Sequence, residues 1–177
     1  MKGQKMDGSI QVYYGNGRGK TTAALGLGIR AAGVGKQVIM VQFLKKKHSD
    51  TLDFLKKLEP ELQIFRFEKA ACGYSDLSPK EKQEQMLNIK NALGYSRKVL
   101  DTGQCDLLIL DEIFGLIDYN IITIEELMDL IAVKKDSMDL ILTGRNLPEE
   151  VREIADCVYS IQREKEKTPE ILAQGIS

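Results

Sequence analysis

The 177-residue chain contains no tryptophan, one histidine and three cysteines. His48 lies in the polar stretch KKKHSD, so we expect a solvated loop residue rather than a member of a catalytic triad or a metal site. The cysteines, Cys72, Cys105 and Cys157, are odd in number and widely spaced, which predicts reduced thiols and argues against a zinc site or a disulfide framework. Cys105 and Cys157 adjoin apolar strand candidates, so we expect both to be buried.

Long apolar runs and strong net charge are also missing. No apolar stretch approaches the roughly 20 residues that span a bilayer, and the polar N-terminus MKGQKMDGS lacks the apolar segment of a signal peptide. The net charge of −1 provides no overall attraction to nucleic acid. The basic run LKKKH (44–48) could contact phosphates, corrinoid carboxamides or a partner, but such runs are more often a solvated surface. We therefore expect a cytoplasmic protein with neither a nucleic-acid nor a membrane partner.

The pattern of the chain predicts one α/β domain over residues 1–177. Helical patterns separate short segments rich in β-branched or aromatic residues, several of them continuously apolar, as strands buried on both faces are. This alternation predicts a mostly parallel sheet of about six strands with helices on both faces. The core spans 9–162, and the charged segment 163–177 is a tail that is either mobile or folded over a ligand. The predicted strands are 10–14, 37–43, 63–67, 106–111, 139–144 and 157–161.

Four segments carry helix signals. Gly33 follows the Ala-rich segment 21–32 as a candidate helix-ending glycine. Capping boxes begin two other helices, with Ser78 and Glu81 around Pro79, and with Thr123 and Glu126. Pro148 stands near the first turn of a helix over 147–155. Gly26 and Gly28 lie within the first helix, where we expect close packing of the helix on the sheet.

The stretch YGNGRGKTT (14–22) has the composition of a phosphate-binding loop. It follows a predicted strand and opens a helix, so that backbone N–H groups and the helix dipole face an anion. Its glycines let the backbone wrap phosphates, the lysine supplies charge, and the following hydroxyl suits Mg²⁺. Tyr14 stands where the usual pattern has glycine, which predicts a tighter loop. The expected nucleotide-binding residues are Gly15, Asn16, Gly17, Arg18, Gly19, Lys20, Thr21 and Thr22.

Two further motifs end predicted strands. LLILDE (107–112) places Asp111 and Glu112 at the carboxyl edge of the sheet, where open α/β sheets bind ligands and where carboxylates can hold Mg²⁺ directly or through water. Either acid could instead cap the following turn. LTGRN (142–146) brings Arg145 to the same edge, where it could bind phosphate or form an ordinary salt bridge.

Five stretches of the chain have an order and spacing that resemble those of the ATP:corrinoid adenosyltransferases. They are GNGRGKTTAALGLGIRAAGVGKQV (15–38), VQF (41–43), LLILDE, LTGRN and EIAD (153–156). That family shares the missing first glycine. The resemblance implies a three-layer, RecA-like P-loop fold and a homodimer, together with an electron-donor protein that keeps the corrinoid reduced. It implies that the Co(I) centre of the corrinoid attacks C5′ of ATP and that triphosphate leaves. It also implies that Lys20, Thr21 and Glu112 are catalytic, and that Thr21 and Glu112, with Asp111, hold Mg²⁺.

The segment ACGYSD (71–76) departs from the family pattern. The family has a GxGFTW-like segment whose aromatic residues press on the corrinoid; here Tyr74 stands in place of phenylalanine and Asp76 in place of tryptophan. Tyr74 is therefore either a corrinoid contact or an ordinary loop residue. Two other functions stay open at this point: a P-loop kinase or NTPase that transfers phosphoryl groups, and a non-catalytic regulator that binds ATP or corrinoid.

Overall fold

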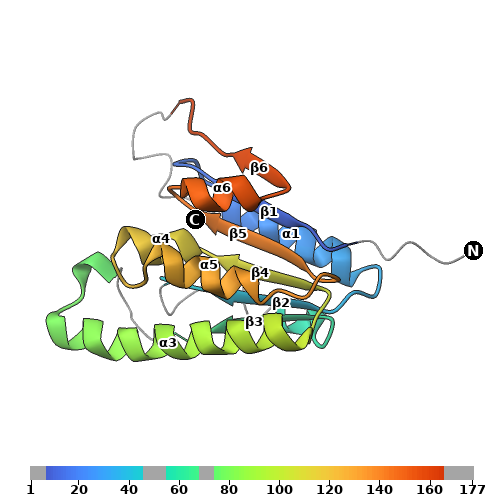
Figure 1. Ribbon diagram of the computed structural model, residues 1–177, viewed down its shortest axis with the longest axis horizontal. Coiled ribbons are helices and arrows are strands. Elements are labelled where there is room, and N and C mark those ends of the chain that lie inside the picture. Colours follow the sequence, from blue (N-terminus) through green and yellow to red (C-terminus); the bar gives the residue numbers. More distant parts are fainter. Residues whose placement is uncertain (1–6, 46–54, 68–73, 166–177) are drawn as a thin grey trace, which may run out of the picture.

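The computed structural model describes residues 7–45, 55–67 and 74–165. Within these ranges six strands form a single sheet, and all of its strand pairs are parallel. The strand order is β3-β2-β4-β5-β1-β6 (Figure 1). Each strand lies within one residue of its predicted bounds. The strands are β1 (Ile10–Tyr14), β2 (Val38–Gln42), β3 (Leu62–Arg66), β4 (Leu107–Asp111), β5 (Asp139–Gly144) and β6 (Cys157–Ser160).

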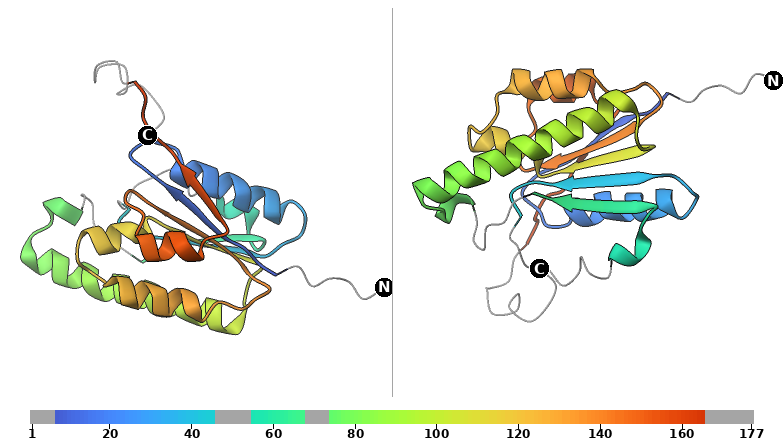
Figure 2. Two further views of the ribbon diagram at one scale, coloured as in Figure 1. Left: turned by 45° about the horizontal axis from the view of Figure 1, so that its top comes forward. Right: turned by 90° about the horizontal axis from the view of Figure 1, so that it is seen from below.

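Helices cover both faces of the sheet, as predicted. On one face lies α1 (Lys20–Ala32), and on the other lie α3 (Pro79–Thr102), α4 (Ile113–Asp118), α5 (Ile124–Ala132) and α6 (Glu149–Ile154) (Figure 2). Short 3₁₀ turns occupy Lys56–Leu58 (η1) and Tyr74–Asp76 (η2). Every residue of the central strands β2 and β4 is buried, because each face of these strands packs against a helix layer. The result is a three-layer α/β fold with a core on each side of the sheet.

The helix starts follow the predicted capping chemistry. The Ser78 and Glu81 side chains and backbones form a complete capping box at α3, and Thr123 and Glu126 form another at α5. Pro148 is the N-cap of α6, one position before its first turn.

α1 ends at Ala32 and Gly33 follows as its C-cap residue, so the helix ends where predicted, but Gly33 is not the glycine that reverses the chain. Gly33 has right-handed helical dihedrals, and Gly35 has a φ of +84°. The Lys36 N–H donates to the Ala31 carbonyl at 3.1 Å and the Gly35 N–H to the Ala32 carbonyl at 2.9 Å. These two bonds form a Schellman motif with Gly35 as the glycine that reverses the chain, so the helical conformation continues beyond Gly33.

Only one of the two glycines inside α1 serves close packing. A Cβ on Gly28 would lie 3.1 Å from both the Ile109 and Leu62 Cδ1 atoms, so this turn of the helix sits tightly on β3 and β4. A Cβ on Gly26 would have no atom within 4 Å. The packing interpretation is therefore confirmed for Gly28 and wrong for Gly26.

The two described cysteines lie in different surroundings. Cys105 is buried as predicted, and burial raises the pKa of its thiol to about 12. Cys157 is exposed, contrary to prediction, because β6 is an edge strand with a neighbour on one side only. Cys72 and His48 lie outside the described residues. Among residues 7–45, 55–67 and 74–165, no helix has the length and apolar character to cross a membrane.

Candidate functional site

The loop after β1 turns at Gly15, one residue after the position where the usual phosphate-loop pattern has its first glycine. Tyr14 is still part of the sheet, in register with Gly144 of β5 and Ser160 of β6. The chain turns at Gly15, whose φ of +122° a side chain would disfavour. Its N–H group points to the carbonyls of Gly144 and Arg145, at 3.2 and 3.1 Å. Position 14 therefore does not require a glycine, and the turn into the loop is made at Gly15.

The segment after β6 packs directly against this loop. The Gly17 N–H donates to the Ile161 carbonyl at 2.9 Å, and the Ile161 N–H donates to Tyr14 O at 2.7 Å. A Cβ on Gly15 would lie 2.3 Å from the Ile161 oxygen, and one on Gly17 would lie 2.8 Å from it. Both glycines are therefore required by close backbone packing, and the C-terminal strand holds the loop in shape.

The first turn of α1 faces the mouth of this loop. Gly19, with a φ of +109°, is the N-cap residue and has no side chain with which to cap the helix. The first turn contains no acidic residue, in contrast to α3 and α5, where glutamates complete capping boxes. The Lys20 ammonium donates to the carbonyl oxygens of Gly15 and Gly17 at 2.7 and 3.0 Å, so it lies inside the loop. An uncapped helix start beside a lysine is suited to an anion.

Asp111, at the end of β4, is the buried centre of the site. Its side chain is fully buried and accepts hydrogen bonds from three neighbours on three different elements. The Thr21 hydroxyl of α1 lies 2.9 and 3.0 Å from the two carboxylate oxygens. The Thr143 hydroxyl of β5 donates to Oδ1 at 2.7 Å, and Nε2 of Gln42 on β2 donates to Oδ2 at 3.0 Å. Such a buried carboxylate is stable only because its lone pairs are satisfied.

Two basic residues extend this network toward the surface. Lys45 places its ammonium 3.5 Å from Oδ2 of Asp111 and 3.2 Å from the Thr21 hydroxyl oxygen. Nε of Arg66 on β3 donates to Oε1 of Gln42 at 2.7 Å, so the Gln42 side chain connects the guanidinium to the carboxylate.

Glu112 differs from Asp111 in both conformation and environment. It is the N-cap residue of α4 and has a φ of +63°, and its N–H donates to Thr143 Oγ1 at 2.9 Å. Burial raises the pKa of the Glu112 carboxyl, with a smaller opposing effect from the nearby Lys45 ammonium. Burial also lowers the pKa of Lys20, and the Glu112 charge partly offsets that change. The Lys20 ammonium and the Glu112 carboxylate thus carry opposite charges close to each other, and burial partly removes both from water.

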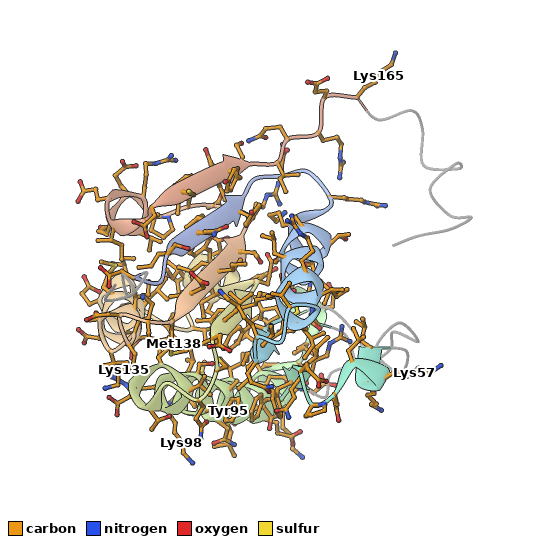
Figure 3. All side chains as sticks on the ribbon, turned by 90° about the vertical axis from the view of Figure 1, so that its right-hand side faces the viewer. Lys57, Tyr95, Lys98, Lys135, Met138 and Lys165 are labelled. Carbon is orange, nitrogen blue, oxygen red and sulfur yellow. The ribbon has the colours of Figure 1, made fainter. Side chains whose placement is uncertain are left out.

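A cavity of about 470 Å³ opens between the loop and the carboxyl edge of the sheet. Arg145 reaches it from the end of β5, and Arg163 from the segment after β6, where the Arg163 N–H donates to Asn16 Oδ1 at 3.2 Å. Beyond Arg163 the chain leaves the sheet, and Lys165 projects outward (Figure 3). The residues lining the cavity are Gly15, Asn16, Lys20, Glu112, Arg145 and Arg163.

Most predicted site residues come together here, but not all of them face the cavity. Gly17 and Gly19 shape the loop, whereas Arg18 and Thr22 are exposed. Tyr74 lies on η2, with its ring 5.2 Å from that of Tyr119 at the end of α4. The structure therefore places Tyr74 in an aromatic pair that is separate from the cavity lining.

Five residues of the site were not named individually from the sequence: Gln42, Lys45, Arg66, Thr143 and Arg163. Gln42 is the one polar residue of a strand that is otherwise apolar, VIMVQ, and this exception was an available signal. Thr143 lies within the LTGRN motif. Lys45 belongs to the run expected to be solvated, yet it is half-buried against Asp111, whereas residues 46–48 lie outside the described ranges. Arg163 had no local signal, because only the fold of β6 beside the loop brings it to the cavity.

Comparison with known proteins gives consistent matches. A family model described as ATP:corrinoid adenosyltransferase BtuR/CobO/CobP matches residues 6–176. The corrinoid adenosyltransferase of Escherichia coli K12 is 30% identical over 155 residues, which cover 88% of this chain and 76% of that protein. The corrinoid adenosyltransferase CobA of Salmonella typhimurium LT2 is 29% identical over 159 residues, covering 90% and 79% of the two chains.

The fold is also similar to that of a solved structure. A KaiC-like protein from Pyrococcus horikoshii OT3 superposes with a TM-score of 0.57 at 20% identity, and the match covers 91% of this chain and 75% of that one. At this identity the likeness supports the α/β three-layer fold alone.

Proposed function

The chain belongs to the ATP:corrinoid adenosyltransferase family, and from this premise we propose how its residues carry out the family reaction. The protein is an enzyme that transfers the adenosyl group of ATP to a corrinoid. We propose that the loop over 15–22 holds the triphosphate, which is the leaving group of the transfer. The observation that carries this proposal is the convergence of Lys20, Arg145 and Arg163 on one cavity beside the uncapped start of α1.

The size and charge of the cavity suit a triphosphate. Its volume of about 470 Å³ falls within the usual range for small-molecule sites. Backbone N–H groups at the start of α1 and the Lys20 ammonium face the region where negative charge would accumulate. Arg145 and Arg163 line the same cavity, and an arginine can bind phosphate oxygens through two parallel hydrogen bonds. ATP binding would replace the two carbonyl contacts of Lys20 with contacts to phosphate.

Thr21, Asp111 and Glu112 have the donor chemistry that Mg²⁺ prefers. They present one hydroxyl and two carboxylates, and Mg²⁺ in phosphate sites is commonly bound by one or two carboxylates together with substrate phosphates and water. Among the described residues there is no cluster of three or more His, Cys, Asp or Glu side chains for a metal ion. When bound, Mg²⁺ would neutralise charge on the phosphate oxygens.

In the proposed reaction the Co(I) centre of the reduced corrinoid attacks C5′ of the ribose. A Co–C bond forms, the C5′–O bond breaks, and the electron pair of that bond leaves with the triphosphate. The nucleophile carries no proton, so no side chain has to act as a base. The chain has to align the reacting atoms and stabilise the departing charge, which is the role we assign to Lys20, Thr21 and Glu112.

For the corrinoid itself we propose Tyr74 as a contact. Its ring packs against Tyr119, which is 46% exposed, and Lys82 lies 5.8 Å from the ring centre. Tyr74→Ala should raise the KM for corrinoid and leave the KM for ATP nearly unchanged. Equal losses for both substrates would show that Tyr74 only supports the fold.

From the family resemblance we also propose a cytoplasmic homodimer that receives its reduced corrinoid through an electron-donor protein. Light scattering on the purified protein tests the dimer. A monomeric mass at micromolar concentrations would contradict it.

An anaerobic assay with Mg-ATP and chemically reduced cob(I)alamin tests the proposed function. We expect the absorption spectrum to change to that of a light-sensitive adenosylated corrinoid, and we expect Lys20→Ala to abolish the change. ATP binding without any alkylation of several reduced corrinoids would favour a regulator. Phosphoryl transfer from ATP would favour a kinase or NTPase.

A further inference from the structure

The Lys45 ammonium lies against two groups whose oxygens could bind a metal cation. It lies 3.2 Å from the Thr21 hydroxyl oxygen and 3.5 Å from Oδ2 of Asp111. These two groups also contact each other between α1 and β4, with the Thr21 hydroxyl oxygen 2.9 Å from Oδ1 and 3.0 Å from Oδ2 of Asp111. A positive charge in contact with a hydroxyl oxygen and a buried carboxylate has the same partners that a divalent cation would take.

The backbone holds Lys45 in this position. The Phe43 N–H donates to the Asp111 backbone carbonyl at 2.9 Å, which extends the pairing of β2 with β4 by one residue. Leu44 then adopts a φ of +55°, an uncommon conformation for a residue with a side chain. Its Cδ1 atom would be 2.6 Å from a Cβ on Gly115, so Leu44 fits closely over the start of α4. This turn directs Lys45 back toward the carboxyl edge of the sheet.

Charge balance explains why a cation is needed there before nucleotide binds. The Asp111 side chain is fully buried, whereas the Lys45 side chain is 30% exposed. A carboxylate removed from water is stabilised by a nearby positive charge. The Lys45 charge also lies near that of Lys20, so the two ammonium groups repel each other until an anion arrives.

We propose that Lys45 is a substitute cation, which holds the metal position of the nucleotide-free enzyme and gives it up to Mg²⁺ when Mg-ATP binds. The inference rests on the proposed Mg²⁺ site at Thr21 and Asp111. Its consequence is that divalent metal binds weakly without nucleotide, because it must first displace an internal ion pair.

The test measures Mn²⁺ binding by electron paramagnetic resonance, in the absence of nucleotide, to the wild-type protein and to Lys45→Met. We expect Lys45→Met to lower the Mn²⁺ dissociation constant about tenfold, which is a modest effect for the loss of one competing charge. Lys36→Met is the matched control: it breaks the ion pair of Lys36 with Asp139 at 3.1 Å but leaves the site intact, so the dissociation constant should not change. Lys45→Arg keeps the charge and should retain weak binding.

A second titration, with a non-reacting ATP analogue present, separates the possible outcomes. The proposal predicts that wild type and Lys45→Met then bind Mn²⁺ with similar affinity, because Lys45 has already left the metal position. Tight Mn²⁺ binding with the analogue, but equal affinities of the two proteins without it, would overturn the role of Lys45 while leaving the Mg²⁺ site intact. No Mn²⁺ binding under either condition would overturn both.

Discussion

Replacing Asp111 with asparagine tests the buried network on which the site depends. In Asp111→Asn, the remaining side-chain oxygen can still accept from Thr21 and Thr143, which both reach Oδ1. The new amide nitrogen would replace Oδ2 and meet the Nε2 donor of Gln42 at 3.0 Å. Gln42 could rotate its amide to correct this clash, but Arg66 would then lose the acceptor that it contacts at 2.7 Å. Either orientation of the Gln42 amide therefore leaves one hydrogen bond of the network unmade.

The expected cost follows from the number of bonds affected. Three hydrogen bonds to a charged acceptor become neutral or unfavourable, and each such bond is worth about 1 kcal/mol more than a neutral one. The Lys45 ion pair at 3.5 Å is lost as well, although the substitution also removes a buried charge, which offsets part of the cost. We expect the free energy of unfolding to fall by about 3 kcal/mol, equivalent to a decrease in Tm of roughly 6–12 °C for a chain of this length.

Urea denaturation of the nucleotide-free protein measures this loss, and a second substitution identifies its cause. Gln42→Glu alone should destabilise the protein, because it places a second carboxylate against Asp111. Combined with Asp111→Asn it should restore stability by at least about 1 kcal/mol relative to the sum of the single effects, since a carboxylate at position 42 accepts from both the new amide and Arg66. Additive effects, or a loss below about 0.5 kcal/mol for Asp111→Asn, would refute the network as described.

Three further predictions concern the loop, Glu112 and α1. Lys20→Ala should reduce the rate of transfer by more than about a hundredfold with an unchanged circular dichroism spectrum, and normal activity would exclude its assigned role. Burial raises the Glu112 pKa above its usual 4.5. The native state therefore loses stability as the pH rises from about the usual pKa through the raised one, because Glu112 ionises less readily in the folded protein. Glu112→Gln should therefore gain stability relative to wild type between about pH 4 and pH 7 in urea titrations; an equal difference at both pH values would contradict this. In thermal melts, Gly26→Ala should stabilise by about 0.5–1 kcal/mol and Gly28→Ala should not, because only Gly28 contacts the sheet closely; equal gains would contradict the packing difference.

The sheet was predictable because its signals are local. Continuous apolar runs such as LLILD and short turn segments fix where buried parallel strands begin and end. The capping boxes at Ser78 and Thr123 are equally local, since each involves residues three positions apart. The end of α1 was predicted, but the glycine that reverses the chain after it was not, because only the hydrogen bonds of the turn show that Gly35 has this role.

The site was only partly predictable because its remaining contacts join distant segments. Asp111 and Thr21 belong to motifs that can be recognised in the sequence, but Gln42, Lys45 and Arg163 reach the site through the strand order and through the course of the chain after β2 and β6. Cys157 shows the same limit. Its sequence surroundings suggest a buried strand, and only the position of β6 at the edge of the sheet makes it exposed.

The central claim is that the loop holds a leaving triphosphate while the C5′–O bond breaks. Phosphorus NMR of the products formed anaerobically from Mg-ATP and excess cob(I)alamin tests it most directly. The account predicts one intact tripolyphosphate for each corrinoid adenosylated. Diphosphate and orthophosphate as the primary products, without formation of a carbon–cobalt bond, would contradict it.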